Sequence, residues 1–185
     1  MALQDLRATY LRDITRTFRN YKVLGDRALA QVPDADLGAV LDPDANSIAI
    51  IVKHVAGNLR SRFTDFLTTD GEKPDRDRDG EFELSDGTSR AEVLQWWESG
   101  WTIALAAVEA LVPEDLERTV FIRGEALLVV EALNRSATHS AYHVGQIILL
   151  ARHCAGPNWR SLSIPKGQSA QFSKGTSKKG IIPNR

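Results

Sequence analysis

The sequence predicts an all-α fold, a four-helix bundle with an irregular C-terminal tail. Four segments repeat apolar residues at steps of three and four, which is the spacing of one helix face. Stretches rich in Pro, Gly, Asp and Ser separate these segments. No segment alternates apolar and polar residues for long enough to predict a sheet. Cofactor and metal sites in such bundles form between side chains of facing helices.

The first expected helix spans about residues 2–30, because apolar residues recur on one face until Pro33 breaks the pattern. The second is expected over about residues 46–67. Asn46 or Ser47 can serve as its N-cap, since a short polar side chain accepts a hydrogen bond from the first free amides. The inner face of this second helix carries a histidine.

The third expected helix runs over about residues 88–111 and is aromatic near its start. Thr88 or Ser89 can cap it. The fourth is expected from residue 125 or 126 to about 154, with Gly156-Pro157 as a strong stop. Two further histidines lie on this last helix.

The segments outside the helices are expected to contain little regular secondary structure. Residues 119–122 are interpreted as a short extended connection, and the densely charged residues 70–81 as a solvated loop. Trp159 and the segment 162–165 are expected to pack back on the bundle. We expect residues 1–170 to form a single domain and residues 171–185 to form a flexible tail.

Composition restricts the function classes. The chain has 185 residues, of which 43% are hydrophobic, and its 23 basic residues nearly cancel its 24 acidic ones. This balance does not favour nucleic acid or an anionic membrane as a partner, and no apolar run reaches the roughly 20 residues of a membrane span. A single cysteine, Cys154, excludes an internal disulfide framework, and the start lacks the layout of a signal peptide, so a cytoplasmic location is expected.

The spacing of three histidines predicts a metal site. His139 and His143 are four residues apart, and in a helix such positions lie on one face roughly 6 Å apart. His54 on the second helix can supply a third imidazole if the two helices pack together. Three protein ligands leave at least one coordination position open, as in catalytic rather than structural zinc sites.

The remaining polar residues on these two faces are candidate pocket residues. Arg135 and Gln146 share the stripe of the histidine pair, and Asn58 lies one turn after His54. Buried polar groups are costly unless they have partners, so these side chains are expected to face a ligand. Gly57 leaves space beside His54.

Three other residues are expected not to take part. His153 is assigned to packing or to the surface, and Cys154 lies about 16 Å from His143 by helical rise, too far for a ligand. Glu125 is more than about 20 Å of helix away from His139, so no catalytic role is assigned to it.

The motifs resemble the DinB-like superfamily of metal-binding four-helix proteins, in which one histidine of the second helix and a His-x-x-x-His pair of the fourth hold a divalent ion. The matching positions are His54, His139 and His143. A bacterial branch of that superfamily without assigned function is most similar, and the resemblance covers nearly the whole chain. The strings that carry it are residues 57–66, 70–74, 142–147 and 159–169.

The resemblance implies a divalent ion, with zinc or nickel expected first and iron possible, because imidazole binds all of them. Some members of the superfamily resemble thiol S-transferases or isomerases that use bacillithiol or mycothiol. The first hypothesis is therefore transfer to or from a low-molecular-weight thiol, with Asn58, Arg135 or Gln146 orienting a small-molecule substrate.

Two other hypotheses stay open. Metal-dependent hydrolysis is one, although Ser140 follows His139 where the His-Glu-x-x-His pattern of zinc proteases has a glutamate. The other is a binding or assembly module in which the ion only braces the bundle. Residues 144–151 are apolar nearly all round the helix, which favours a homodimer.

Overall fold

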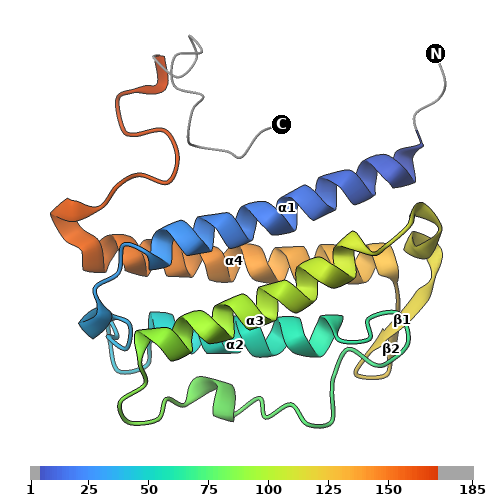
Figure 1. The fold of residues 1–185 in the computed structure, drawn as a ribbon, viewed down its shortest axis with the longest axis horizontal. Helices are drawn as coiled ribbons and strands as arrows, with labels where there is room; N and C mark the ends of the chain where they lie inside the picture. The colour runs from blue at the N-terminus through green and yellow to red at the C-terminus, as the bar shows by residue number, and fades with distance from the viewer. Residues whose placement is uncertain (1–4, 171–185) are drawn as a thin grey trace.

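A computed structural model describes residues 5–170, most of which lie in helices. Four long helices lie side by side, with a short β-hairpin at one end (Figure 1). Helix α2 packs against α3 and α4, and α1 packs against α4 and α3. This arrangement is compatible with the expected all-α bundle. The helices are α1 Leu6–Leu29, α2 Ile48–Phe63, α3 Arg90–Glu109 and α4 Val129–Ala155.

The helix starts follow the expected capping chemistry. Ser47 is the N-cap of α2, where its hydroxyl accepts a hydrogen bond from the Ile50 amide at 3.3 Å. Ser89 caps α3 and forms a capping box with Glu92, whose carboxylate accepts from the Ser89 amide. Helix α4 ends where it was predicted to end, because Gly156 adopts a φ of 52° that other residues rarely take.

The start of α4 was predicted wrongly, since residues 125–128 form a strand. Strands β1 Thr119–Ile122 and β2 Glu125–Leu128 pair antiparallel. Both residues of the connecting turn, Arg123 and Gly124, have positive φ angles, which is the turn that suits the twist of a hairpin. Val120 and Ile122 point into the core while their neighbours face outwards. The predicted extended connection is thus one half of a hairpin.

Helix α2 also ends earlier than predicted, and the charged segment after it is not a simple solvated loop. The chain leaves the helix at Phe63, and Asp65 adopts a left-handed φ of 48°. The segment then runs back along the bundle (Figure 1). Lys53 of α2 donates to the carbonyls of Gly80 and Glu83, at 2.7 Å each, so the second half of the segment is fixed against α2.

The core is continuous between the helices and includes the segment after α4. Leu162 is buried and Trp159 packs against the core, as expected from the sequence. Aromatic rings fill the centre, where Phe18 meets Trp101 and Phe63 edge to face. Among residues 5–170, no helix is long and apolar enough to cross a membrane. The expected flexible tail, residues 171–185, lies outside the described residues.

Two glycines allow a test of how closely the helices pack. A Cβ at Gly100 would lie 2.7 Å from the Ala56 Cα, whereas a Cβ at Gly145 would meet nothing within 4 Å. Gly100→Ala is expected to destabilise the fold by about 1–2 kcal/mol, because overpacking outweighs the gain in helix propensity. Gly145→Ala is expected to stabilise it by about 0.5–1 kcal/mol. Urea unfolding of both variants measures the difference; equal shifts would contradict the close α2–α3 contact.

Candidate metal centre

The three predicted histidines lie together between α2 and α4. His54 is in the middle of α2, and His139 and His143 are one turn apart on α4. Each offers a ring nitrogen, and these three atoms lie within 4.8 Å of one another. The closest pair is His54 Nε2 and His139 Nε2 at 3.3 Å. The packing of α2 on α4 has therefore gathered residues that are 85 positions apart in the chain.

Two neighbours fix which nitrogen faces the centre in two of the three rings, those of His54 and His143. The Nδ1 of His54 is 2.9 Å from Glu81 Oε2, and the Nδ1 of His143 is 2.8 Å from Gln146 Oε1. Carboxylate and amide oxygens only accept hydrogen bonds, so both Nδ1 atoms donate. In the neutral rings the Nε2 lone pairs are then free and point to the centre. Such partners are typical of metal-binding histidines.

The two histidines of α4 are uncharged at neutral pH. Burial, reinforced by the other histidines and by the nearby Arg62 and Arg76, lowers the pKa of His139 to about 3. Burial also lowers the pKa of His143 to about 4, although its hydrogen bond to Gln146 opposes the shift. A folded pKa below the ordinary value means that the neutral ring is favoured. Neutral imidazole is the form that binds a metal ion.

Glu81 connects the charged segment to the centre. Its carboxylate is only 6% exposed and receives hydrogen bonds from Arg76 at 2.7 and 2.9 Å as well as from His54. Burial opposes its ionisation, but the bonds from His54 and Arg76 outweigh burial and lower the pKa of Glu81. Gly57 makes room for this group, since a Cβ there would lie 2.2 Å from Glu81 Oε1. The space expected beside His54 is thus filled by a carboxylate.

A cavity of about 280 Å³ adjoins the histidines and is bordered by His54 and His139. Of the predicted pocket residues, Asn58 and Arg135 line it. Gln146 is not among the lining residues and instead holds His143. Ile122 and Arg123 place the β-hairpin at the cavity wall. The centre is therefore open on one side to a space of small-molecule size.

Sequence reasoning missed several residues around the metal centre and the cavity beside it. Glu81 and Arg76 come from the segment interpreted as a solvated loop, and Arg62, Arg78 and Arg123 line the cavity without having been singled out. The available signal was Gly57, a position without a side chain one turn from a candidate ligand. The sequence around Gly57 does not indicate which distant residue fills that space.

The residues present fit a divalent ion. His143 Nε2 is buried, and within residues 5–170 it has no hydrogen-bond partner. The lone pair of His54 Nε2 faces His139 Nε2, a contact that a shared proton or a metal ion can satisfy. His153 is exposed, and neither it, Cys154 nor Glu125 belongs to the cluster. Three imidazoles around one point are a donor set for zinc, nickel or iron.

A comparison with protein-family models matches residues 5–168 to one family, described as a protein of unknown function (DUF1572). The match spans the four helices, the hairpin and all three histidines. No curated protein matches the chain.

Proposed function

The chain belongs to the DUF1572 family, whose function is unknown, and from its site we propose a metal-dependent enzyme of the thiol S-transferase type with a DinB-like bundle. His54, His139 and His143 hold the divalent ion in this proposal. The substrates are a low-molecular-weight thiol and an electrophilic small molecule. A reducing cytoplasm, expected from the single Cys154, suits such chemistry.

The observation that carries the proposal is the opening of the histidine cluster onto the cavity. His54 and His139 contribute to both, so a group bound at the centre faces a space large enough for a small molecule. A structural ion would be expected to have its ligand positions filled by protein. Here the imidazoles come from two helices only, and in this proposal the side of the cluster that faces the cavity takes the substrate.

When bound, a divalent ion in such a site lowers the pKa of a coordinated water or thiol and so supplies a nucleophile at neutral pH. The protein residues then have three roles. Glu81 and Gln146 keep the imidazoles of His54 and His143 in the metal-binding tautomer. Asn58 and Arg135 offer hydrogen-bond donors to the substrate from the cavity wall. The Phe82 ring lies 5.0 Å from the His54 ring and shields it.

Base-assisted hydrolysis is less well supported than thiol transfer. The residues lining the cavity include four arginines and no carboxylate, so the described wall provides no general base for activating water. A thiol, whose ordinary pKa is about 8.5, needs much less assistance than water to lose its proton. This difference in acidity favours a thiol as the nucleophile.

A direct activity assay tests the proposal. Protein loaded with zinc or nickel is incubated with bacillithiol, mycothiol or cysteine and an aryl halide or epoxide, and consumption of the thiol is followed. We expect turnover with at least one thiol that disappears when the ion is removed and returns when it is restored. Stoichiometric metal without turnover of any thiol would contradict the transferase and leave a metal-braced binding module.

A homodimer is the partner proposal, and one surface of α4 favours it. Tyr142 and Leu149 are seven residues apart, so they share one side of the helix, and they are 52% and 66% exposed. Large contiguous apolar patches are typical of an interface, and in this proposal the two side chains belong to one such patch. Light scattering at micromolar concentration is expected to show a dimer that Leu149→Asp converts to a monomer. Leu6→Asp, at a leucine of α1 that is 79% exposed, should leave the dimer intact; a monomeric wild type would contradict the proposal.

A further inference from the structure

The cavity beside the histidines has a strongly one-sided charge. Four of the residues that line it are arginines, and no aspartate or glutamate is among them. This bias is local, because the whole chain carries a net charge of only −1. A small molecule that enters the cavity therefore meets guanidinium groups on several sides. The arginines are Arg62, Arg78, Arg123 and Arg135.

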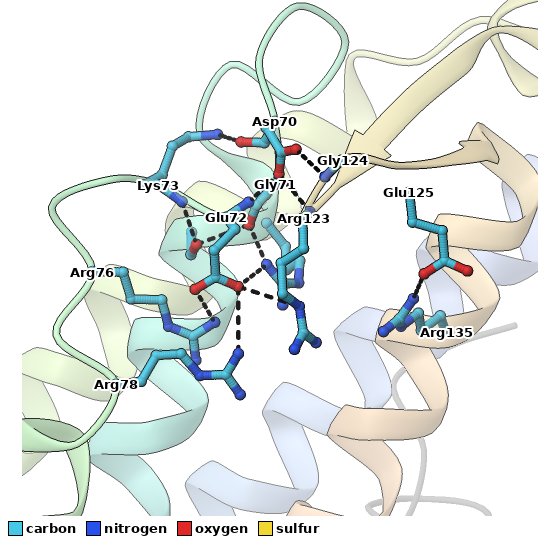
Figure 2. A network of polar contacts seen from close by, with 12 residues as sticks. Asp70, Gly71, Glu72, Lys73, Arg76, Arg78, Arg123, Gly124, Glu125 and Arg135 are labelled. Carbon is cyan, nitrogen blue, oxygen red and sulfur yellow. Dashed lines mark hydrogen bonds and ion pairs between the residues drawn. The ribbon is translucent and has the colours of Figure 1, made fainter.

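The nearest carboxylates neutralise only part of this charge. Glu72 lies at the centre of the cluster and is shared by four guanidinium groups (Figure 2). The Arg62 contact is 3.1 Å, and the contacts of Arg76, Arg78 and Arg123 are 3.7, 3.5 and 3.7 Å. Arg76 also pairs with Glu81. With Arg135 and its partner Glu125 included, and with Asp70 beside the hairpin turn, five guanidinium groups meet four carboxylates, which leaves an excess of one positive charge before any metal ion is added.

Several contacts hold these arginines in place, so the positive charge has a defined position. The Asp70 carboxylate accepts hydrogen bonds from the amides of Arg123 and Gly124, at 2.8 Å each, and so fixes the hairpin turn. Glu125 of β2 pairs with Arg135 at 3.2 Å (Figure 2). The Arg62 side chain is 9% exposed and donates to the Gly71 carbonyl.

Arg62 experiences the positive charge of its neighbours. Burial lowers the pKa of Arg62; Glu72 opposes the shift, and the neighbouring Arg76 and Arg123 add to it. A desolvated group of like charges is stabilised by an anion, and charge-assisted bonds from arginine to an oxyanion are among the strongest hydrogen bonds in proteins.

We propose that this arginine cavity binds a carboxylate or phosphate group of a small molecule and so makes the substrate, or the thiol that accompanies it, an acidic compound. Arg123 and Arg135 bind the anionic group from the hairpin side and from α4, and Arg62 contributes its positive charge from α2. The reacting atom of the same molecule is thereby placed beside His54 and His139. As a statement about the substrate of the enzyme, the inference rests on the proposed function.

Anion binding can be measured without the metal. Isothermal titration calorimetry at low ionic strength is made on chelator-treated, dialysed protein with succinate, with inorganic phosphate and with uncharged succinamide. We expect succinate, phosphate or both to bind and succinamide not to bind. Binding of succinate alone would identify a carboxylate ligand, and binding of phosphate alone a phosphorylated one. Failure of both anions to bind up to tens of millimolar would overturn the inference.

Variants connect the binding to the cavity. Arg123→Gln and Arg135→Gln are each expected to weaken anion binding about 10-fold or more, as expected for a lost charge-assisted bond. Arg60→Gln is the matched control, because Arg60 is on α2 but pairs with Asp75 and does not line this cavity. Anion binding that all three variants retain would also overturn the inference.

Metal binding and anion binding can be refuted independently of each other. Metal uptake is measured by itself, by adding zinc or nickel to the chelator-treated wild-type protein. A protein that binds succinate or phosphate but no metal would refute the enzyme proposal and keep the anion site. A protein that binds metal but neither anion would refute the anion site and leave the metal centre in place.

Discussion

Replacing His139 with alanine is expected to abolish stoichiometric metal binding. The three histidines supply every nitrogen of the cluster, and their donor atoms lie within 4.8 Å of one another. Losing an outer-shell partner of a metal ligand costs 10–100-fold in affinity, so losing a ligand itself is expected to cost more than about 100-fold. Elemental analysis of untagged protein, purified without added metal or chelator, measures the effect and identifies the ion.

His153→Ala is the matched control for this experiment. It removes the same side chain from the same helix, but His153 is exposed and outside the cluster. Metal content should therefore match the wild type, and circular dichroism should show that both variants keep their helices. A folded wild-type protein that contains no metal and takes up neither zinc nor nickel would refute the metal centre. The three histidines would then be packed core residues.

The parts of the site that are local in sequence could be predicted. His139 and His143 meet because they are one helical turn apart, a relation that the sequence contains in full. Ser47 and Ser89 act on amides of their own helices, and Gly156 ends α4 through its own φ angle. The position of His54 on the inner face of α2 follows from the apolar period. Each of these predictions depends on residues within a single helix or directly next to it.

The parts that depend on distant contacts could not be predicted. Glu81 is 27 residues from His54 and lies in a segment whose alternating charges resemble those of a solvated loop. The turn at Arg123-Gly124 lacks the Asn-Gly or Asp-Gly signal of a hairpin, and it is fixed by Asp70, 53 residues earlier. The apolar residues before α4 therefore suited a helix as well as a strand. Tertiary contacts select the strand over the helix.

Glu81→Ala is expected to affect both stability and metal binding. The Arg76 side chain is 1% exposed and its strongest partner is Glu81, so the variant leaves a buried charge without its main counter-ion. Breaking a buried pair from one side typically costs about 3–5 kcal/mol. His54 also loses the acceptor that holds its Nδ1 hydrogen, which is expected to weaken metal binding 10–100-fold. Urea unfolding and competition with a zinc chelator measure the two effects.

Two further variants separate the causes. Glu81→Gln keeps an acceptor for His54 Nδ1 but removes the charge opposite Arg76. The free energy of unfolding should therefore fall clearly, and the metal affinity should fall only slightly. Asp75→Ala breaks the exposed pair with Arg60 in the same segment and should change neither quantity measurably. If Glu81→Ala were as stable as Asp75→Ala, the segment 70–81 would be the solvated loop that its composition suggests. A joint loss of stability and metal affinity in Glu81→Ala would instead show that one carboxylate fixes this segment to α2 and orients His54.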